Sequence, residues 1–222
     1  MNGAEAIASL SDRVHADFEA RTRARDQALA QCRLLTRHAA NAIRAIHRDE
    51  YPLAHEHLAQ AAQLAGALKD GLTAYPDLFH AGYTQDAIKE FVEATLVDAL
   101  VRNQPVPLPD DLGVNTATYL NGLAEVTGEL RRRCLDILRQ GYSQEAERLM
   151  TAMDEIYTLL VTVDYPDAIT NGLRRQTDVV RGIVERTRAD LTLALREHSL
   201  MRAILHLSGQ LDQDDHADDP RL

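Results

Sequence analysis

Two pairs of glutamates carry the chemistry that this sequence offers. Glu90 and Glu93 are three residues apart and Glu125 and Glu129 four, within two stretches with helical patterns of apolar residues. Each spacing places both carboxylates on one face of a helix. The face of Glu90 and Glu93 is otherwise apolar, and an unpaired charge buried there costs several kcal/mol. These carboxylates therefore need a partner, which is a bound cation, an arginine or water.

Four carboxylates brought together would repel one another and would require cations. Ligands that are all oxygen favour Mg²⁺ or Mn²⁺ over Zn²⁺. Such ions activate water and stabilise the charge that develops in phosphodiester cleavage. A di-iron bundle is the rival interpretation, and it requires Glu-x-x-His motifs on two helices. The residues at the corresponding positions are Leu96, Gly128 and Arg132, which argues against iron.

Arginines form a second candidate site, on a long helix predicted from about Glu5 to Arg48. Four of them fall within about 60° of one another around the helix axis, and these are Arg33, Arg37, Arg44 and Arg48. Two interpretations stay open at this point. The arginines form a solvated face paired with Glu and Asp, or they form a stripe that contacts phosphates.

Composition and charge limit the class of protein. The 222 residues include no Trp, and Ala, Leu and Arg are abundant, which is typical of helices. The formal net charge of −10 argues against indiscriminate nucleic-acid binding but allows a local basic stripe. Cys32 and Cys134 lie in separate helical patterns, so we expect buried thiols rather than a disulfide. No apolar run suits a membrane span or a signal peptide, which predicts a cytoplasmic protein.

Apolar periodicity and the positions of the prolines predict long helices separated by short breaks. The predicted helices cover about residues 5–48, 52–69, 77 or 84–102 and 115 or 116–139. A further helix, capped by Ser143, carries apolar residues from Ala146 to Val161, and after a break at residues 164–167 a final helix runs to about Leu207. Prolines at alternate positions predict a loop over Asn103–Asp111. The pattern predicts an all-α fold, an antiparallel bundle of six or seven helices. We expect one domain over residues 1–208 and a disordered acidic tail over residues 209–222.

Two glycines interrupt the helix that carries Glu125 and Glu129. Gly122 and Gly128 each cost stability inside a helix, because glycine loses more backbone freedom on folding than other residues. We therefore expect both glycines to mark places where another helix approaches closely.

Two stretches around the glutamates form recognisable motifs. Residues 90–94 read Glu-Phe-Val-Glu-Ala, and residues 119–130 read Tyr-Leu-Asn-Gly-Leu-Ala-Glu-Val-Thr-Gly-Glu-Leu. They are similar to Glu-Tyr-Val-Glu-Ala and Tyr-Leu-x-Gly-x-x-Asp-Leu-Thr-Gly-Glu-Leu of the translin family, in its translin-associated protein X branch. The likeness covers most of residues 23–196.

The resemblance implies a seven-helix bundle that assembles into hollow octamers and binds single- and double-stranded nucleic acid inside. The X-like subunits of the family are Mg²⁺-dependent endoribonucleases. The acidic residues of their active site correspond here to Glu90, Glu93, Glu125 and Glu129. Glu125 departs from the family pattern, which has Asp there, and its longer side chain would shift the metal position.

The resemblance also assigns a role to the arginines of the N-terminal helix. Basic residues on this part of the family fold contact RNA, which makes Arg33, Arg37, Arg44 and Arg48 candidate RNA ligands. The resulting hypothesis is a homo-oligomeric, Mg²⁺-dependent endoribonuclease, with Mn²⁺ as a substitute metal and no membrane partner. The alternative is a non-catalytic protein of the same family that binds RNA or single-stranded DNA. A helical protein–protein scaffold is a third class, and it predicts no RNA binding even at low salt.

Overall fold

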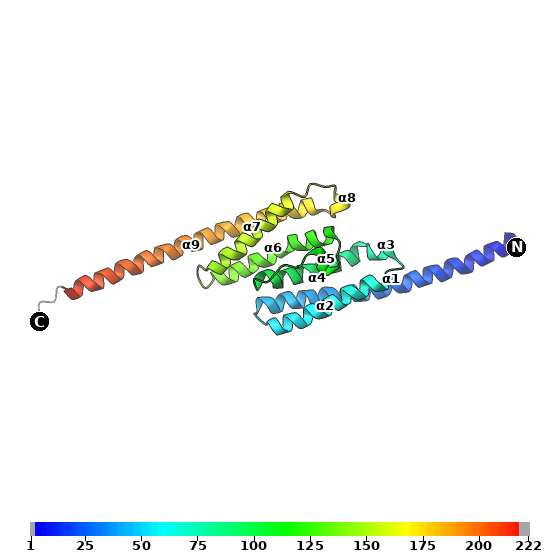
Figure 1. The fold of residues 1–222 in the computed structure, drawn as a ribbon, viewed down its shortest axis with the longest axis horizontal. Helices are drawn as coiled ribbons and strands as arrows, with labels where there is room; N and C mark the ends of the chain where they lie inside the picture. Colours follow the sequence, from blue (N-terminus) through cyan, green and yellow to red (C-terminus); the bar gives the residue numbers. More distant parts are fainter. Residues whose placement is uncertain (1–2, 218–222) are drawn as a thin grey trace. The chain divides into compact units, whose positions relative to one another are not determined.

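The computed structural model describes residues 3–217, and this part of the chain is helical without any strand. The helices are α1 (Gly3–His47), α2 (Tyr51–Gly71), α3 (Pro76–Phe79), α4 (Gly82–Val101), α5 (Pro109–Leu112), α6 (Thr116–Leu138), α7 (Gln144–Val161), α8 (Asp167–Thr170) and α9 (Leu173–Ala217). Helices α3, α5 and α8 are single turns of four residues. The all-α prediction is confirmed, with six long helices among the described residues (Figure 1).

The chain divides into two compact units. One unit comprises Met1–Val126 with Tyr165–Arg174, and the other comprises Thr127–Asp164 with Arg175–Leu222. Helix α6 begins in the first unit and ends in the second. The expectation of one domain over residues 1–208 stays a prediction.

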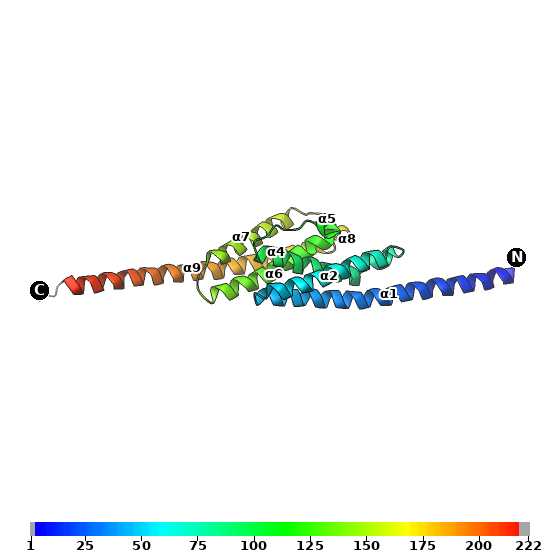
Figure 2. The same ribbon diagram turned by 60° about the horizontal axis from the view of Figure 1, so that its bottom comes forward.

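In the first unit, α1 packs against α2 and α4. The second half of α1 runs beside α2 in both ribbon views (Figures 1 and 2). The chain reverses between them at Asp49, whose φ of 59° is a left-handed conformation that Asp tolerates. Pro52 then stands in the first turn of α2, where its missing N–H costs nothing. Leu35, Leu68 and Phe91 are buried in the core that joins the three helices.

In the second unit, the apolar stripes of α7 and α9 are buried. Their buried members include Leu149, Met153, Leu160, Val180, Val184 and Leu191. Ser143 caps α7, as its side chain accepts a hydrogen bond from the Glu145 N–H at 3.2 Å. The Arg131 side chain of α6 binds the Asp190 carboxylate at 2.8 Å and donates to the Thr187 hydroxyl at 3.0 Å.

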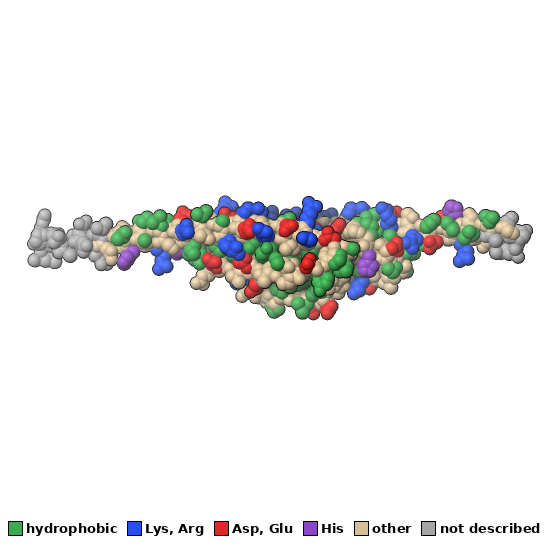
Figure 3. Space-filling model, turned by 90° about the horizontal axis from the view of Figure 1, so that it is seen from above, with side chains coloured by type: hydrophobic (Ala, Val, Ile, Leu, Met, Phe, Trp, Pro, Cys, Tyr) green, Lys and Arg blue, Asp and Glu red, His purple; other side chains and the backbone are tan. Residues whose placement is uncertain are grey.

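Both terminal helices extend beyond the rest of their own unit. Every described residue from Gly3 to Glu19 on α1 is exposed, as is every residue from Leu195 to Ser208 on α9. Hydrophobic side chains lie at the surface of both segments (Figure 3). They are Ile7, Leu10, Val14 and Phe18 on α1, and Leu195, Leu200, Met201, Ile204, Leu205 and Leu207 on α9. Apolar surfaces of this kind mark sites of association.

Two details differ from the sequence expectations. Pro109 starts a single helical turn inside the segment expected to be a loop, because proline suits the first position of a helix. Helix α9 continues through Ala217, so the first part of the expected tail is helical. Residues 218–222 of that tail lie outside the described residues.

The remaining expectations concern cysteines and membranes. Cys32 and Cys134 are both buried free thiols, which confirms their predicted role as small core residues. Within residues 3–217, no helix combines the length and the apolar character that crossing a bilayer requires.

Candidate functional site

Helix α4 is the buried centre of the first unit. Most of its side chains are buried, including Val92, Leu96 and Val97 at zero exposure. Its first turn is fixed by Thr84, whose hydroxyl donates to the Leu78 carbonyl at 2.8 Å, and by Gln85, whose amide donates to the Phe79 carbonyl at 2.8 Å. The glutamates of α4 therefore sit on a rigid element.

Gly122 lets α6 approach α4 next to those glutamates. A Cβ atom built at Gly122 would lie 2.8 Å from the Val92 Cγ1 and 3.1 Å from the Lys89 carbonyl oxygen. The close approach expected at Gly122 is confirmed. Since Glu125 lies one turn further along α6, this contact brings it towards α4.

The expectation for Gly128 was wrong. A Cβ atom there would meet no heavy atom within 4 Å among the described residues. Gly128 lies in the second unit, further along α6 than the close approach at Gly122.

Three of the four predicted glutamates come together. One carboxylate oxygen from each of Glu90, Glu93 and Glu125 lies within 4.8 Å of the other two. Glu93 is 9% exposed, and the Glu90 and Glu125 side chains are 31% and 25% exposed. Three carboxylates in partial burial repel one another strongly enough to require positive charge.

Lys89 supplies such a charge and is a member of the site that the spacing of the glutamates did not reveal. Its Nζ donates to the Glu125 Oε1 at 2.6 Å and lies 3.9 Å from the Glu90 Oε1. Burial lowers the pKa of Lys89, but the hydrogen bond to Glu125 and the attraction of the nearby carboxylates raise it more. The sequence did contain a signal, because Lys69 and Lys89 are the only lysines in an arginine-rich chain.

Burial also acts on Glu90. It raises the pKa of this carboxyl, Lys89 lowers it, and the negative charges of Glu125 and Asp86 raise it further, so the net shift is upward. A raised carboxyl pKa means that the ionised form is disfavoured and would gain from another cation.

The donor set fits a hard divalent cation. Mg²⁺ takes oxygen ligands at about 2.1 Å, so ligands on opposite sides of the ion stand about 4.2 Å apart. The separations of up to 4.8 Å between the three carboxylate oxygens are close to that value, and small side-chain rotations would close the difference. Among the described residues, the group that could hold a cation contains no histidine or cysteine, which argues against Zn²⁺.

Glu129, the fourth predicted ligand, lies one turn beyond Glu125 on α6 and belongs to the second unit. Its Oε2 is 3.7 Å from the Arg132 Nη1. The group of carboxylates found within the described part of the chain does not include it. The role of Glu129 as a metal ligand stays a prediction.

The predicted arginine stripe lies on α1, on the side opposite its buried stripe. Arg33, Arg37 and Arg44 line the solvent side of the helix, while Leu35, Ala39 and Ala42 are fully buried. Arg48, which was expected on the same helix, is exposed in the turn after α1, because the helix ends at His47. Arg44 donates to the Asn41 side chain. Among the described residues, no carboxylate lies within ion-pair distance of the other three arginines. Their charges are therefore available to a ligand.

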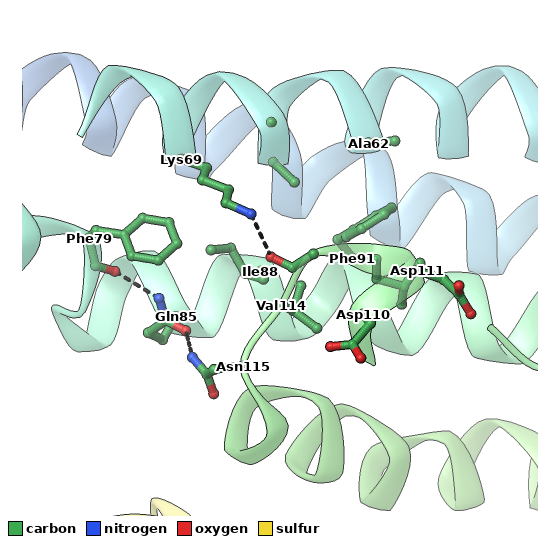
Figure 4. A pocket seen from close by; sticks show the side chains of 14 residues that line it. Ala62, Lys69, Phe79, Gln85, Ile88, Phe91, Asp110, Asp111, Val114 and Asn115 are labelled. Atoms are coloured by element: carbon green, nitrogen blue, oxygen red, sulfur yellow. Dashed lines mark hydrogen bonds between the residues drawn. The ribbon is translucent and has the colours of Figure 1, made fainter. Parts of the chain in front are cut away.

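A cavity of about 440 Å³ lies beside α4, away from the three glutamates. Several of its polar groups pair with one another (Figure 4). Lys69 Nζ donates to the Gly113 carbonyl at 3.3 Å, and the Gln85 Oε1 accepts from the Asn115 amide at 2.7 Å. These bonds hold the segment before α6 against α2 and α4, which is a structural role.

The chain is similar to known proteins in sequence and in fold. No family model matches the chain. An uncharacterized protein of Methanocaldococcus jannaschii is 33% identical over 191 residues, which is 83% of this chain and 84% of that protein. The crystal structure of apo-NeC3PO has a TM-score of 0.76, with 82% of this chain and 96% of that chain covered, and its 20% identity shows the fold alone.

Two further structures are more similar in sequence. The crystal structure of AfC3PO is 30% identical with a TM-score of 0.77, over 84% of this chain and 97% of that chain. AfC3PO in complex with duplex RNA is 30% identical with a TM-score of 0.73, over 84% and 96% of the two chains. On this identity and coverage, the chain belongs to the translin family, the family of the C3PO proteins.

Proposed function

We propose that this chain is an X-like member of the translin family that binds RNA and cleaves its phosphodiesters with Mg²⁺, or with Mn²⁺ in its place. One observation carries the proposal. Glu90 and Glu93 of α4 and Glu125 of α6 present carboxylate oxygens within 4.8 Å of one another in a partly buried site. Helices that pack together for stability alone rarely gather three carboxylates in one place.

The glutamates and Lys89 have different proposed roles in the site. Glu90, Glu93 and Glu125 would hold the cation, with Glu129 as a further candidate ligand. When bound, Mg²⁺ activates water and neutralises the charge that develops on the phosphate. Lys89 balances part of the carboxylate charge before a cation binds, since its ammonium already contacts Glu125 at 2.6 Å.

The solvent-facing arginines of α1 support RNA as the partner. AfC3PO, to which this chain is 30% identical, forms a complex with duplex RNA. The chain carries a net charge of −10, so RNA needs a local basic surface. Arg33, Arg37 and Arg44 on one side of α1, with Arg48 in the turn after it, provide that surface.

Salt dependence tests the arginine assignment. Replacing Arg37 and Arg44 with Gln should reduce the slope of log affinity against log salt by about 0.7–0.9 for each phosphate that no longer pairs with an arginine. The control is Arg181→Gln on α9, because Arg181 already pairs with Glu185 at 3.1 Å. Identical slopes for wild type, the double variant and the control would exclude these arginines from the RNA interface.

The exposed apolar segments of α1 and α9 support assembly into a homo-oligomer. Leu200 and Ile204 are 62% and 56% exposed, which is costly for a helix that stays in water. An octamer is the state that the family resemblance implies.

Cleavage of a labelled RNA tests the enzymatic assignment. With Mg²⁺, wild type should cleave the RNA, and a Glu90→Gln/Glu93→Gln variant should lose about a hundredfold or more of the rate. Glu56→Gln, at an exposed position of α2, is the matched control and should cleave like wild type. Equal rates for wild type and the double variant would contradict the assignment.

A non-catalytic RNA- or single-stranded-DNA-binding protein is the second candidate. The ammonium of Lys89 favours it, because it already compensates Glu125 without any metal. This candidate predicts a gel shift of RNA by wild type with no cleavage in Mg²⁺ or Mn²⁺.

A further inference from the structure

A cavity of about 410 Å³ lies between α1 and α4 in the first unit. Leu29 and Arg33 line it from α1, and Tyr83, Asp86 and Glu90 line it from α4. Cavities that hold small molecules in proteins start at about 300 Å³. This cavity has room for one nucleoside but not for a folded segment of another chain.

Glu90 connects the cavity to the candidate cation site. It lines the cavity and also belongs to the group of three carboxylates. A phosphate held by a cation at those carboxylates would therefore lie at the border of the cavity. The sugar and base attached to that phosphate are the parts of a nucleic acid that could enter it.

The cavity wall suits a base and a sugar. Leu29 provides apolar surface, and the aromatic ring of Tyr83 packs against the core formed by Cys32, Leu35 and their neighbours. Bases stack on aromatic rings of this kind without strong preference for sequence. The Tyr83 hydroxyl has no hydrogen-bond partner among the described residues and is itself buried, so an occupant would bond it only if the ring turned towards the cavity.

The charged side chains that line the cavity determine when a nucleotide can bind in it. Arg33 lines the cavity and pairs with no described carboxylate. Asp86 and Glu90 are both acidic and would repel a phosphate, and Lys89 is already engaged by Glu125. A nucleotide should therefore bind well only when a divalent cation neutralises the carboxylates.

We propose that this cavity holds the nucleoside next to the phosphate that the chain cleaves. Its ligand class is a nucleoside monophosphate bound together with a divalent cation. Arg33 would supply positive charge to the phosphate, and Leu29 and Tyr83 would line the part that the nucleoside occupies. The proposal rests on the proposed cation site at Glu90, Glu93 and Glu125.

Calorimetric titration with adenosine 5′- and 3′-monophosphate and with inorganic phosphate, each with Mn²⁺, tests it. At least one nucleotide should bind wild type about tenfold or more tightly than phosphate, and should lose that advantage in EDTA. Leu29→Trp fills the cavity and should reduce nucleotide affinity to that of phosphate. Leu34→Trp is the control, because Leu34 is 39% exposed on the same helix and lies outside the cavity.

The outcomes separate the cavity from the nuclease activity. Nucleotides that bind no better than phosphate, or that bind Leu29→Trp as they bind wild type, overturn the proposal. Wild type that binds Mn²⁺ and cleaves RNA while Leu29→Trp keeps full nucleotide affinity overturns the cavity assignment alone. A nucleotide that Leu29→Trp excludes, in a protein that cleaves no RNA, supports the cavity and removes the nuclease function. Circular dichroism of each variant confirms that it is folded.

Discussion

Lys89 shows how a single side chain controls the chemistry of the site. Its ammonium group contacts Glu125 at 2.6 Å and lies 3.9 Å from Glu90. It therefore provides part of the positive charge that a bound metal ion would provide. A divalent cation that binds the three glutamates must compete with this ammonium. The lysine therefore stabilises the metal-free protein and weakens metal affinity at once.

Replacing Lys89 with Met separates those two effects. Without metal, Lys89→Met should lower the free energy of unfolding by about 1–2 kcal/mol, because Glu125 then lacks its partner. Added Mg²⁺ or Mn²⁺ should raise the melting temperature of the variant more than that of wild type. Thermal unfolding with and without metal measures both effects, and Arg181→Met, at an exposed arginine of α9 in the second unit, controls for loss of charge. A variant that responds to metal no more than wild type does would contradict competition.

Spacing and resemblance predicted four glutamates for the site, and the structure brings three of them together. Helix geometry fixes which residues share a face, and Glu90 and Glu93 follow from that rule. It does not fix which neighbour neutralises them, since this depends on how deeply α4 and α6 pack. Lys89 was missed for that reason, although it stands next to Glu90 in the sequence.

The approach of α4 and α6 is the element-scale feature that builds the site. Gly122 allows it, because any Cβ would press on Val92 and on the carbonyl oxygen of Lys89. The flexible end of a side chain can move away, but the carbonyl belongs to the backbone of α4. The distance between Glu125 and the two glutamates of α4 therefore depends on this glycine.

Gly122→Ala should lower the free energy of unfolding by about 1–3 kcal/mol, as overpacked contacts do. The same change should weaken divalent-cation affinity by moving Glu125 away from α4. Gly128→Ala is the matched control on the same helix, and it should raise stability by about 0.5–1 kcal/mol because no described atom obstructs a Cβ there. Thermal unfolding and Mn²⁺ titration of both variants provide the test. Two variants with the same stability would show that α4 and α6 do not meet as described.

The long helices followed from apolar periodicity and prolines, while the single turns did not. Helix α6 starts at one of the two expected positions, directly after Asn115, whose side-chain oxygen accepts the Thr118 N–H at 2.8 Å. Helix α5 depends on a local bond, in which the Asp111 carboxylate accepts the Leu108 N–H at 2.8 Å. A single hydrogen bond of this kind does not change the pattern of apolar residues, so the sequence pattern predicts a loop for this segment.

At the scale of the whole molecule, the ends of α1 and α9 need partners that one chain does not provide. Their apolar side chains are exposed over many residues on each helix, including Phe18 at 62% and Leu205 at 68%. Helices this long gain most of their stability from packing, so isolated ends would fray. Assembly with further copies would bury them, but periodicity alone does not reveal which surfaces pair between copies.

Light scattering after size-exclusion chromatography tests this expectation. Wild type should form a particle of several chains, and Leu200→Glu/Ile204→Glu should reduce its mass by placing charges on the apolar face. Ser199→Glu adds a charge at an exposed polar position of the same helix and should leave the mass unchanged. A monomeric wild type, or a double variant with the mass of wild type, would contradict assembly through α9.

The central claim is that Glu90, Glu93 and Glu125 bind a divalent cation, and direct titration with Mn²⁺ tests it. Electron paramagnetic resonance reports free Mn²⁺, so affinity can be measured without any RNA substrate. We predict saturable binding to wild type, affinity about tenfold or more weaker in Glu93→Gln, and no change in the Glu56→Gln control. Wild type that leaves Mn²⁺ free, or Glu93→Gln that binds it as tightly as wild type, would contradict the claim.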